Sequence, residues 1–518
     1  MKQFILKYYP FGIMLLLCIF YMYKAISFPL HDFANYYFGA QFLADGEFNT
    51  SIYFPSEFNK AIADLGFENI FVSYAPNTPF LAVFFLPFTM ISVVKAKIFF
   101  NLISSFLLLL SCFRLFDFYK INLKYAILIP IVFFIPIKNN LLFGQVYFLL
   151  FFLLAESLIA YEKQQLKKMS LFLSLSIALK VFPILFLLLF IFKKQYKPLI
   201  YICGVCAFLF GISLLLTGLE VWVFFLKTVL PRASNGEIAT AFVDNYQSVF
   251  MFLKRLLVYD EIENPYAFSV ASSYFPISIL AFKLGCISLG YFITRNSNNN
   301  LQIFSFWILA SILLSPYGST YTFIVLLFAF LTLAKSEISN FKKILLFGIL
   351  FLTNNLSVSF FIENQFPFSY VRLFFLIAFF ILFMIYFYKK STFIKAFSMG
   401  CFVFFMGTFF KQNISKTSTS FLTEESPILI YDYKITNNQL TYFYWNEKGE
   451  NTNSVPLLSN KAEKLELKNN QIYYNNKQLT FDKSNKLKPT LIDQKTILFL
   501  SDYERGIGFY TLQKLNYN

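Results

Sequence analysis

Three polar side chains stand out because they lie beside or inside long apolar runs. Asp32 follows the first apolar run, Gln145 begins a later one, and Lys180 lies within another. A carboxylate partly removed from water has a raised pKa and suits general-base work on a hydroxyl group. An ammonium deep in an apolar segment suits an anion such as a phosphate. These three residues are therefore the first candidates for chemistry.

Each of the three candidates also has a purely structural explanation. Asp32 could cap the helix that follows it. Lys180 could extend its ammonium group to one membrane interface, and Gln145 could join two helices by hydrogen bonds. The residue types alone leave both explanations open.

The sequence offers little for metal or nucleophilic chemistry. His31 is the only histidine in the chain, which excludes a histidine-based metal site. An oxygen-only Mg²⁺ or Mn²⁺ site in the acidic segment after the first apolar run stays open. The sequence contains no nucleophile–His–acid grouping and no phosphate-cradling glycine loop, so hydrolase and ATPase activities have no support. We expect no cofactor.

The composition defines the elements that must position these side chains. Hydrophobic residues make up 57% of the 518 residues and charged residues 14%, whereas soluble chains average about 45–50% and about 25%. The net charge is +16, with lysines in short clusters between apolar runs, such as Lys167-Lys168 and Lys193-Lys194. This pattern marks cytoplasmic loops of a protein in a lipid bilayer and argues against nucleic acid as a partner.

The apolar runs predict an all-α polytopic membrane protein with about 11–13 transmembrane helices and a cytoplasmic N-terminus. The segment 123–137 holds Pro130 and Pro136 and is predicted to be broken or re-entrant. The segment 169–192 has lysine clusters at both ends. It is predicted to form a hairpin of two half-helices, 169–180 and 183–192, with Lys180 near the tip. The spans predicted with more regular patterns are 1–23, 77–94, 96–116, 141–161, 198–217, 271–293, 301–316, 318–334, 343–361, 370–388 and 394–411.

The composition becomes polar near residue 412. We therefore expect a polytopic part at 1–411 and a small extracytoplasmic β domain at 412–518. Stretches of alternating polarity, such as 428–435 and 440–445, predict a β meander. The topology places two further segments on the same outer side, 30–76 and 218–270.

An ordered series of motifs resembles the membrane glycosyltransferases of the GT-C superfamily, specifically the GT87-like type that depends on polyprenyl-phosphate-mannose. The series covers about 30–320 of the chain. Its members are Asp32-x-x-x-Tyr36, Gly39-Ala40, Gly46, Tyr74-Ala-Pro76, Pro79, Phe143-Gly144-Gln145, Ala178-Leu-Lys180-Val-Phe-Pro183, Asn245-Tyr-Gln247-Ser248, Arg255 and Leu314-Ser315-Pro316.

The resemblance implies a metal-independent, inverting transfer of a hexose, with mannose the expected sugar. The donor would be a polyprenyl-phosphate-linked sugar, the acceptor a glycan or glycolipid, and the place the outer face of the cell membrane. The position that matches the family's general base is Asp32. The residues implied to bind the donor phosphate are Lys180, Arg232 and Arg255. Those implied to bind sugar or substrate are Tyr36, Gln145, Asn245 and Gln247.

Two other functions fit parts of the pattern. A transporter or flippase of lipid-linked glycans would also have many spans and an intramembrane lysine, although the sequence has no inverted repeat of the kind common in transporters. A membrane scaffold that presents the β domain would leave the ordered motifs unexplained. An Asp32→Asn variant separates an enzyme from a transporter, because only the enzyme needs the base.

Overall fold

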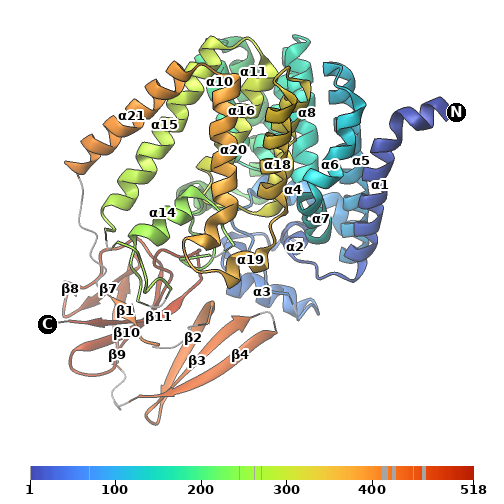
Figure 1. The fold of residues 1–518 in the computed structure, drawn as a ribbon. Coiled ribbons are helices and arrows are strands. Elements are labelled where there is room, and N and C mark those ends of the chain that lie inside the picture. The colour runs from blue at the N-terminus through green and yellow to red at the C-terminus, as the bar shows by residue number, and fades with distance from the viewer. Residues whose placement is uncertain are drawn as a thin grey trace.

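The computed structural model describes residues 2–68, 70–243, 245–261, 263–269, 271–410, 418–422, 427–446, 448–457 and 463–517. Helices pack side by side in a bundle, and the strands gather beyond one end of it (Figure 1). The order of a helical part followed by a strand-rich part is as predicted. The predicted boundary between residues 411 and 412 lies outside the described residues.

The described part of the chain contains helices α1 to α21 and seven shorter helical turns. The α-helices are α1 Lys2–Ser27, α2 Asp32–Ala44, α3 Pro55–Asp64, α4 Pro79–Phe85, α5 Val93–Tyr119, α6 Leu128–Val132, α7 Phe134–Phe143, α8 Tyr147–Glu162, α9 Leu166–Leu179, α10 Phe186–Phe192, α11 Tyr196–Thr217, α12 Leu219–Phe224, α13 Leu230–Ser234, α14 Val249–Leu257, α15 Tyr274–Asn296, α16 Asn300–Leu314, α17 Leu327–Lys335, α18 Asn340–Asn355, α19 Val358–Glu363, α20 Val371–Phe387 and α21 Lys390–Thr408. The 3₁₀ turns are η1 Thr50–Tyr53, η2 Leu86–Met90, η3 Leu123–Ile127, η4 Phe182–Leu185, η6 Thr320–Leu326 and η7 Phe368–Tyr370, and η5 Phe225–Val229 is a π turn.

The number of helices that can cross a membrane is lower than predicted. Among the described residues, six helices are long and apolar enough, and a bent pair makes a seventh candidate. Spanning a bilayer takes about 20 helical residues. Several apolar runs that the sequence presents as single spans are divided into shorter pieces: the run 318–334 forms η6 and α17, and the run 77–94 is split between α4, η2 and the start of α5. The expected count of about 11–13 spans was therefore wrong as a count of full-length helices.

The predicted break in the segment 123–137 is confirmed. The helical stretches Leu123–Val132 and Phe134–Phe143 meet at an angle of 61°. Proline removes an amide donor and crowds the preceding turn, and Pro130 and Pro136 flank the bend.

The hairpin predicted at 169–192 is also confirmed. The Ser157 hydroxyl donates to the carbonyl of Met169 at 3.4 Å, and the Tyr161 hydroxyl donates to Oε1 of Gln195 at 2.7 Å. Both ends of the segment therefore lie beside the C-terminal half of α8. The chain leaves α9 at Leu179 and returns through η4 and α10. Lys180 is consequently at the tip, toward the end where α8 begins.

Antiparallel sheets make up the C-terminal domain, as the alternating stretches predict. The strand orders are β2-β3-β4, β6-β7-β8 and β1-β11-β10-β9-β5, so two of the three sheets are simple meanders. Their largest apolar cluster includes Ile430, Leu440, Leu498, Leu500 and Leu512. The strands are β1 Thr419–Ser420, β2 Leu429–Thr436, β3 Gln439–Asn446, β4 Gly449–Pro456, β5 Glu463–Lys464, β6 Glu466–Lys468, β7 Gln471–Tyr474, β8 Lys477–Gln478, β9 Lys486–Leu491, β10 Thr496–Ser501 and β11 Thr511–Asn516.

Candidate functional site

A cavity of about 390 Å³ lies where α2, the start of α8, the hairpin tip and the C-terminal domain meet. Four of the eight predicted site residues line it: Asp32, Tyr36, Gln145 and Lys180. They come from three separate parts of the sequence. Ile428 and Phe509 of the C-terminal domain complete the lining on another side. We call this the polar cavity.

The carboxylate of Asp32 is the last acceptor in a short chain of hydrogen bonds that begins at Tyr36 and passes through Gln145. Nε2 of Gln145 donates to Oδ2 of Asp32, and the Tyr36 hydroxyl donates to Oε1 of Gln145 at 2.7 Å. His31, not Asp32, is the residue that precedes the first turn of α2. The side chain of Asp32 is thus directed to Gln145, in the turn between α7 and α8, instead of capping its own helix. Gln145 joins this turn to α2 through Asp32 and Tyr36, and it holds the acid in doing so.

The environment of Asp32 makes its carboxylate a better base. Burial raises the pKa of the Asp32 carboxyl, while the nearby basic side chains of His31 and Lys180 and the hydrogen bond from Gln145 oppose the rise. Desolvation disfavours the charged form, whereas a donated hydrogen bond and nearby cations favour it. The outcome is a pKa above the ordinary value, in a group that is still stabilised as a carboxylate.

The ammonium of Lys180 is held by a neutral group. Its Nζ donates to Oδ1 of Asn77 at 2.8 Å and lies 5.6 Å from the ring centroid of Tyr36. Among the described residues, no ion pair engages Lys180 or Asp32. An amide orients an ammonium group without cancelling its charge. The positive charge of Lys180 is therefore available to an anion in the polar cavity.

A glycine turn places Gln145 against α2. Gly144 has φ of 66°, a left-handed conformation that favours glycine, and ends α7. A Cβ at this position would lie 2.8 Å from Cβ of Phe33 in α2. The missing side chain thus permits both the sharp turn and the close approach that brings the Gln145 amide to Asp32.

The turn before α4 fixes the hairpin tip at two points. The Thr78 hydroxyl donates to the carbonyl of Ala178 at 2.7 Å, which satisfies one of the carbonyls left open at the end of α9. Its neighbour Asn77 binds the ammonium of Lys180. The consecutive residues Asn77 and Thr78 thus position both the Lys180 side chain and the backbone of the hairpin tip.

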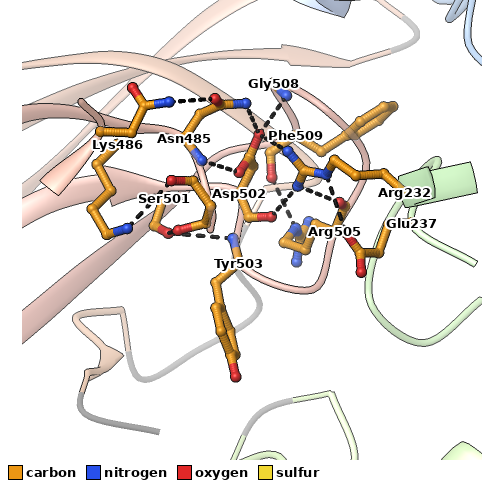
Figure 2. Close-up of polar contacts among 12 residues, drawn as sticks. Arg232, Glu237, Asn485, Lys486, Ser501, Asp502, Tyr503, Arg505, Gly508 and Phe509 are labelled. Atoms are coloured by element: carbon orange, nitrogen blue, oxygen red, sulfur yellow. Dashed lines mark hydrogen bonds and ion pairs between the residues drawn. The ribbon is translucent and has the colours of Figure 1, made fainter. Parts of the chain in front are cut away.

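Arg232, predicted to bind the donor phosphate, instead joins the helical part to the C-terminal domain (Figure 2). Its Nη1 donates to Oδ2 of Asp502 at 2.9 Å, and its Nη2 donates to the carbonyls of Asp502 and Arg505, both at 2.8 Å. Its Nε donates to Glu237 at 3.1 Å. All three nitrogens are engaged by protein, and the residue does not line the polar cavity. Arg232 is therefore not part of the proposed donor site.

The three other predicted residues also lie away from the cavity lining. Asn245 is exposed. Gln247 is buried, and its Nε2 donates to the carbonyl of Ser369 at 2.9 Å. The guanidinium of Arg255 lies 5.7 Å from the ring centroid of Phe242. The segment contributes Tyr246 to the lining instead.

Several lining residues were not predicted from the sequence. Asn77 and Tyr246 stand beside or within a quoted motif, which was the available signal, whereas Tyr321 lies five positions after Leu314-Ser315-Pro316. Asn35 also lines the cavity, and its Oδ1 is buried without a hydrogen-bond partner among the described residues. Neutral hydrogen-bonding groups of this kind suit a ligand rich in hydroxyl groups.

Metal ligands do not gather in the part of the chain that the structure describes. No group of three or more His, Cys, Asp or Glu side chains there is placed to hold an ion. The acidic side chains of the segment 30–68 are included in this statement.

The fold and the polar cavity together define a polytopic membrane protein with an acid and a lysine converging at one end of its helix bundle. Residues 75–316 match the family model of glycosyltransferase family 87. This part of the chain is thus similar to the membrane glycosyltransferases of family 87, as the motif series predicted. The match includes Gln145 and Lys180, whereas Asp32, Tyr36 and the C-terminal domain lie outside it. No match was found among curated proteins.

Proposed function

We propose that the protein transfers a hexose, with mannose the expected sugar, from a polyprenyl-phosphate donor to a glycan or glycolipid acceptor. The transfer inverts the anomeric centre and needs no metal. One observation carries the proposal: Asp32 and Lys180 line the same cavity, and each is held by a neutral amide, Gln145 and Asn77 respectively. The site therefore offers one base and one cation that are not ion-paired with each other.

The proposed transfer removes a proton from the acceptor hydroxyl and builds negative charge on the donor phosphate. Asp32 can accept the proton, and Lys180 can stabilise the negative charge. The acceptor hydroxyl gives its proton to the carboxylate of Asp32 as its oxygen forms a bond to the anomeric carbon. The bond from that carbon to the donor phosphate oxygen breaks, and the electron pair leaves with the phosphate. The ammonium of Lys180 stabilises this developing charge, and a site poor in water strengthens the interaction.

A second cavity supports a donor with a lipid tail. It has a volume of about 660 Å³ and an almost wholly apolar lining from α14, α15, α20 and α21. Tyr246 lines the polar cavity, and Val249, three positions later, lines the apolar one. A ligand with a charged head and a long apolar chain suits two cavities that share one short segment. The apolar cavity would hold part of the polyprenyl chain.

Charge distribution favours the proposed orientation in the cell membrane. Lys168 lies 3.8 Å from Glu156, and Lys193 binds Asn300, so the lysine clusters of the hairpin lie at the end of α8 remote from the polar cavity. By the positive-inside rule this end is cytoplasmic. The N-terminus would then be cytoplasmic, and the polar cavity and the C-terminal domain would face outward.

The test is a transfer assay with purified protein. It uses a synthetic short-chain polyprenyl-phosphate-mannose, a panel of glycan and lipid acceptors, and parallel samples with and without a chelator. We expect donor consumption that survives chelation and is lost in Asp32→Asn. Product formation by Asp32→Asn at the wild-type rate would overturn the proposed mechanism. Lipid-phosphate binding without turnover of any acceptor would favour a different lipid-linked sugar or transport.

A further inference from the structure

A third cavity lies between the helical part and the C-terminal domain. It has a volume of about 500 Å³ and is lined by Phe54, Glu57 and Lys60 at α3 and by residues of the strands and their loops. We call it the interdomain cleft. Its lining is more polar than that of the apolar cavity and holds three large aromatic rings with a polar edge, those of Tyr431, Trp445 and Tyr510.

The chemistry of the cleft favours an uncharged ligand rich in hydroxyl groups. Tyrosine and tryptophan rings offer flat apolar faces with a polar edge. Glu57 and Lys60 have no ion-pair partner among the described residues, and they stand on the same short helix with opposite charges. Charges of both signs at one site disfavour a polyanion or a polycation, whereas sugar hydroxyl groups can donate to a carboxylate and accept from an ammonium.

The cleft and the polar cavity are separated by very little chain. Phe509 lines the polar cavity, and the next residue, Tyr510, lines the cleft. The carboxylate of Asp502 accepts from Nδ2 of Asn485, which lines the cleft, and from the amide of Gly508, which precedes Phe509 (Figure 2). A chain-like ligand with one end in the polar cavity has the cleft as its neighbouring surface.

We propose that the interdomain cleft binds the non-reacting part of a neutral glycan chain, as a second subsite for the acceptor. This inference rests on the proposed transferase function for its link to catalysis, while glycan binding in the cleft stands by itself. The ligand class is a linear, uncharged oligosaccharide. The half-buried ring of Tyr431 packs on a sugar face, and Glu57 and Lys60 bind hydroxyl groups. Trp445 and Tyr510 are buried and contribute only a small part of their rings to the cleft lining.

The experiment measures binding, not transfer, and so it is independent of donor and base. Full-length protein in nanodiscs is titrated calorimetrically with linear neutral tetrasaccharides of mannose, glucose, galactose and N-acetylglucosamine, without donor. Tryptophan fluorescence is recorded in parallel, because Trp445 lines the cleft and the other two tryptophans, Trp222 and Trp307, lie in helices. We expect saturable binding of at least one tetrasaccharide with a fluorescence change that is lost in Trp445→Phe.

Matched variants locate the site. Tyr431→Ala and Glu57→Gln should each weaken binding by about tenfold or more, as anchor residues of interfaces do. Tyr473→Ala in the same domain and Asp64→Asn in the same helix lie outside the lining and should leave the affinity unchanged. Absence of saturable binding with all four sugars, or equal affinity in the cleft variants and their controls, would overturn the inference. If the cleft binds glycan but the protein has no transferase activity, the inference of a glycan-binding cleft holds and only the proposed reaction is excluded.

Discussion

Asp32 and Lys180 lie in one cavity, and each is bound by an amide in place of the other's charge. Direct pairing would satisfy both groups and leave neither for a substrate. The amides of Gln145 and Asn77 orient the two side chains while preserving a base and a cation. These two side chains therefore supply the chemistry of the proposed transfer.

Removing the base should remove transfer. We expect Asp32→Asn to lower kcat/KM by about 10²–10⁴-fold, the usual contribution of a general base. The pH profile gives a second test. Because burial raises the pKa of Asp32 above its ordinary value, activity should be present above that raised pKa and lost as the pH falls through it.

Gln145→Ala sharpens the pH test. This variant removes the hydrogen bond that favours the carboxylate, so the pKa of Asp32 should rise further and the acid limb of the profile should move to higher pH. The measurement is kcat/KM against pH for wild type and variant. An unchanged acid limb would show that Asp32 is not the group that titrates.

Lys180 should act on the donor. Lys180→Ala is expected to weaken binding of a short-chain polyprenyl phosphate by about tenfold or more, since a charge-assisted contact contributes about 1.5–3 kcal/mol. Asn77→Ala should weaken it less, because the charge remains and only its orientation is lost. Calorimetric titration with the lipid phosphate measures both. Wild-type affinity in Lys180→Ala would exclude a role in phosphate binding.

The sequence predicted part of this site. Asp32, Gln145 and Lys180 could be predicted because a polar group beside or inside an apolar run costs free energy and so indicates a role. Tyr36 followed from the motif. Arg232 was assigned to the donor phosphate, because the sequence does not reveal its partner Asp502, which lies 270 positions later. The roles of all these residues in transfer stay predictions.

At the scale of elements, two chain breaks position the site. The hairpin tip presents Lys180, and the turn at Gly144 presents Gln145. Proline and lysine spacing predicted the hairpin, because a single span would have placed one lysine cluster on the wrong side. Hydropathy overestimated the number of full spans, because an apolar run does not reveal where a helix changes to a 3₁₀ turn or ends within the bundle.

Gly144→Ala tests the second break. A left-handed conformation costs a residue with a side chain about 1–2 kcal/mol, and the added Cβ would meet Phe33. We expect lower thermal stability together with reduced kcat, because Gln145 would move away from Asp32. Gly204→Ala is the control, since space around Gly204 is open. Wild-type kcat in Gly144→Ala would contradict the positioning role of the turn.

At the scale of the whole molecule, the loop between β10 and β11 connects the two parts of the chain. Asp502 is fully buried beneath Arg232, and the amide of Gly506 donates to the carbonyl of Ala239 at 2.7 Å. A Cβ at Gly506 would lie 2.4 Å from the carbonyl carbon of Ile238. Close backbone contact and a buried ion pair therefore hold the C-terminal domain against the helical part.

Breaking the pair should loosen the C-terminal domain. Asp502→Ala removes one buried partner of the Arg232 guanidinium and leaves Glu237 as the other. The cost should therefore lie below the roughly 3–5 kcal/mol typical of a buried charge with no partner left. We expect faster hydrogen–deuterium exchange in residues 502–510 and lower transfer activity, because Phe509 lines the polar cavity. Lys468→Ala, which removes an exposed pair with Glu466, is the control. Exchange equal to wild type in Asp502→Ala would show that the pair does not hold the loop.

The contribution of Ile428 and Phe509 to the polar cavity has a consequence for biosynthesis. Asp32, Gln145 and Lys180 leave the ribosome before Ile428 and Phe509 do. A nascent chain stalled before residue 428 would hold the acid, the amide and the lysine without the part of the lining that the C-terminal domain supplies. The polar cavity is therefore complete only after residue 509 has been made.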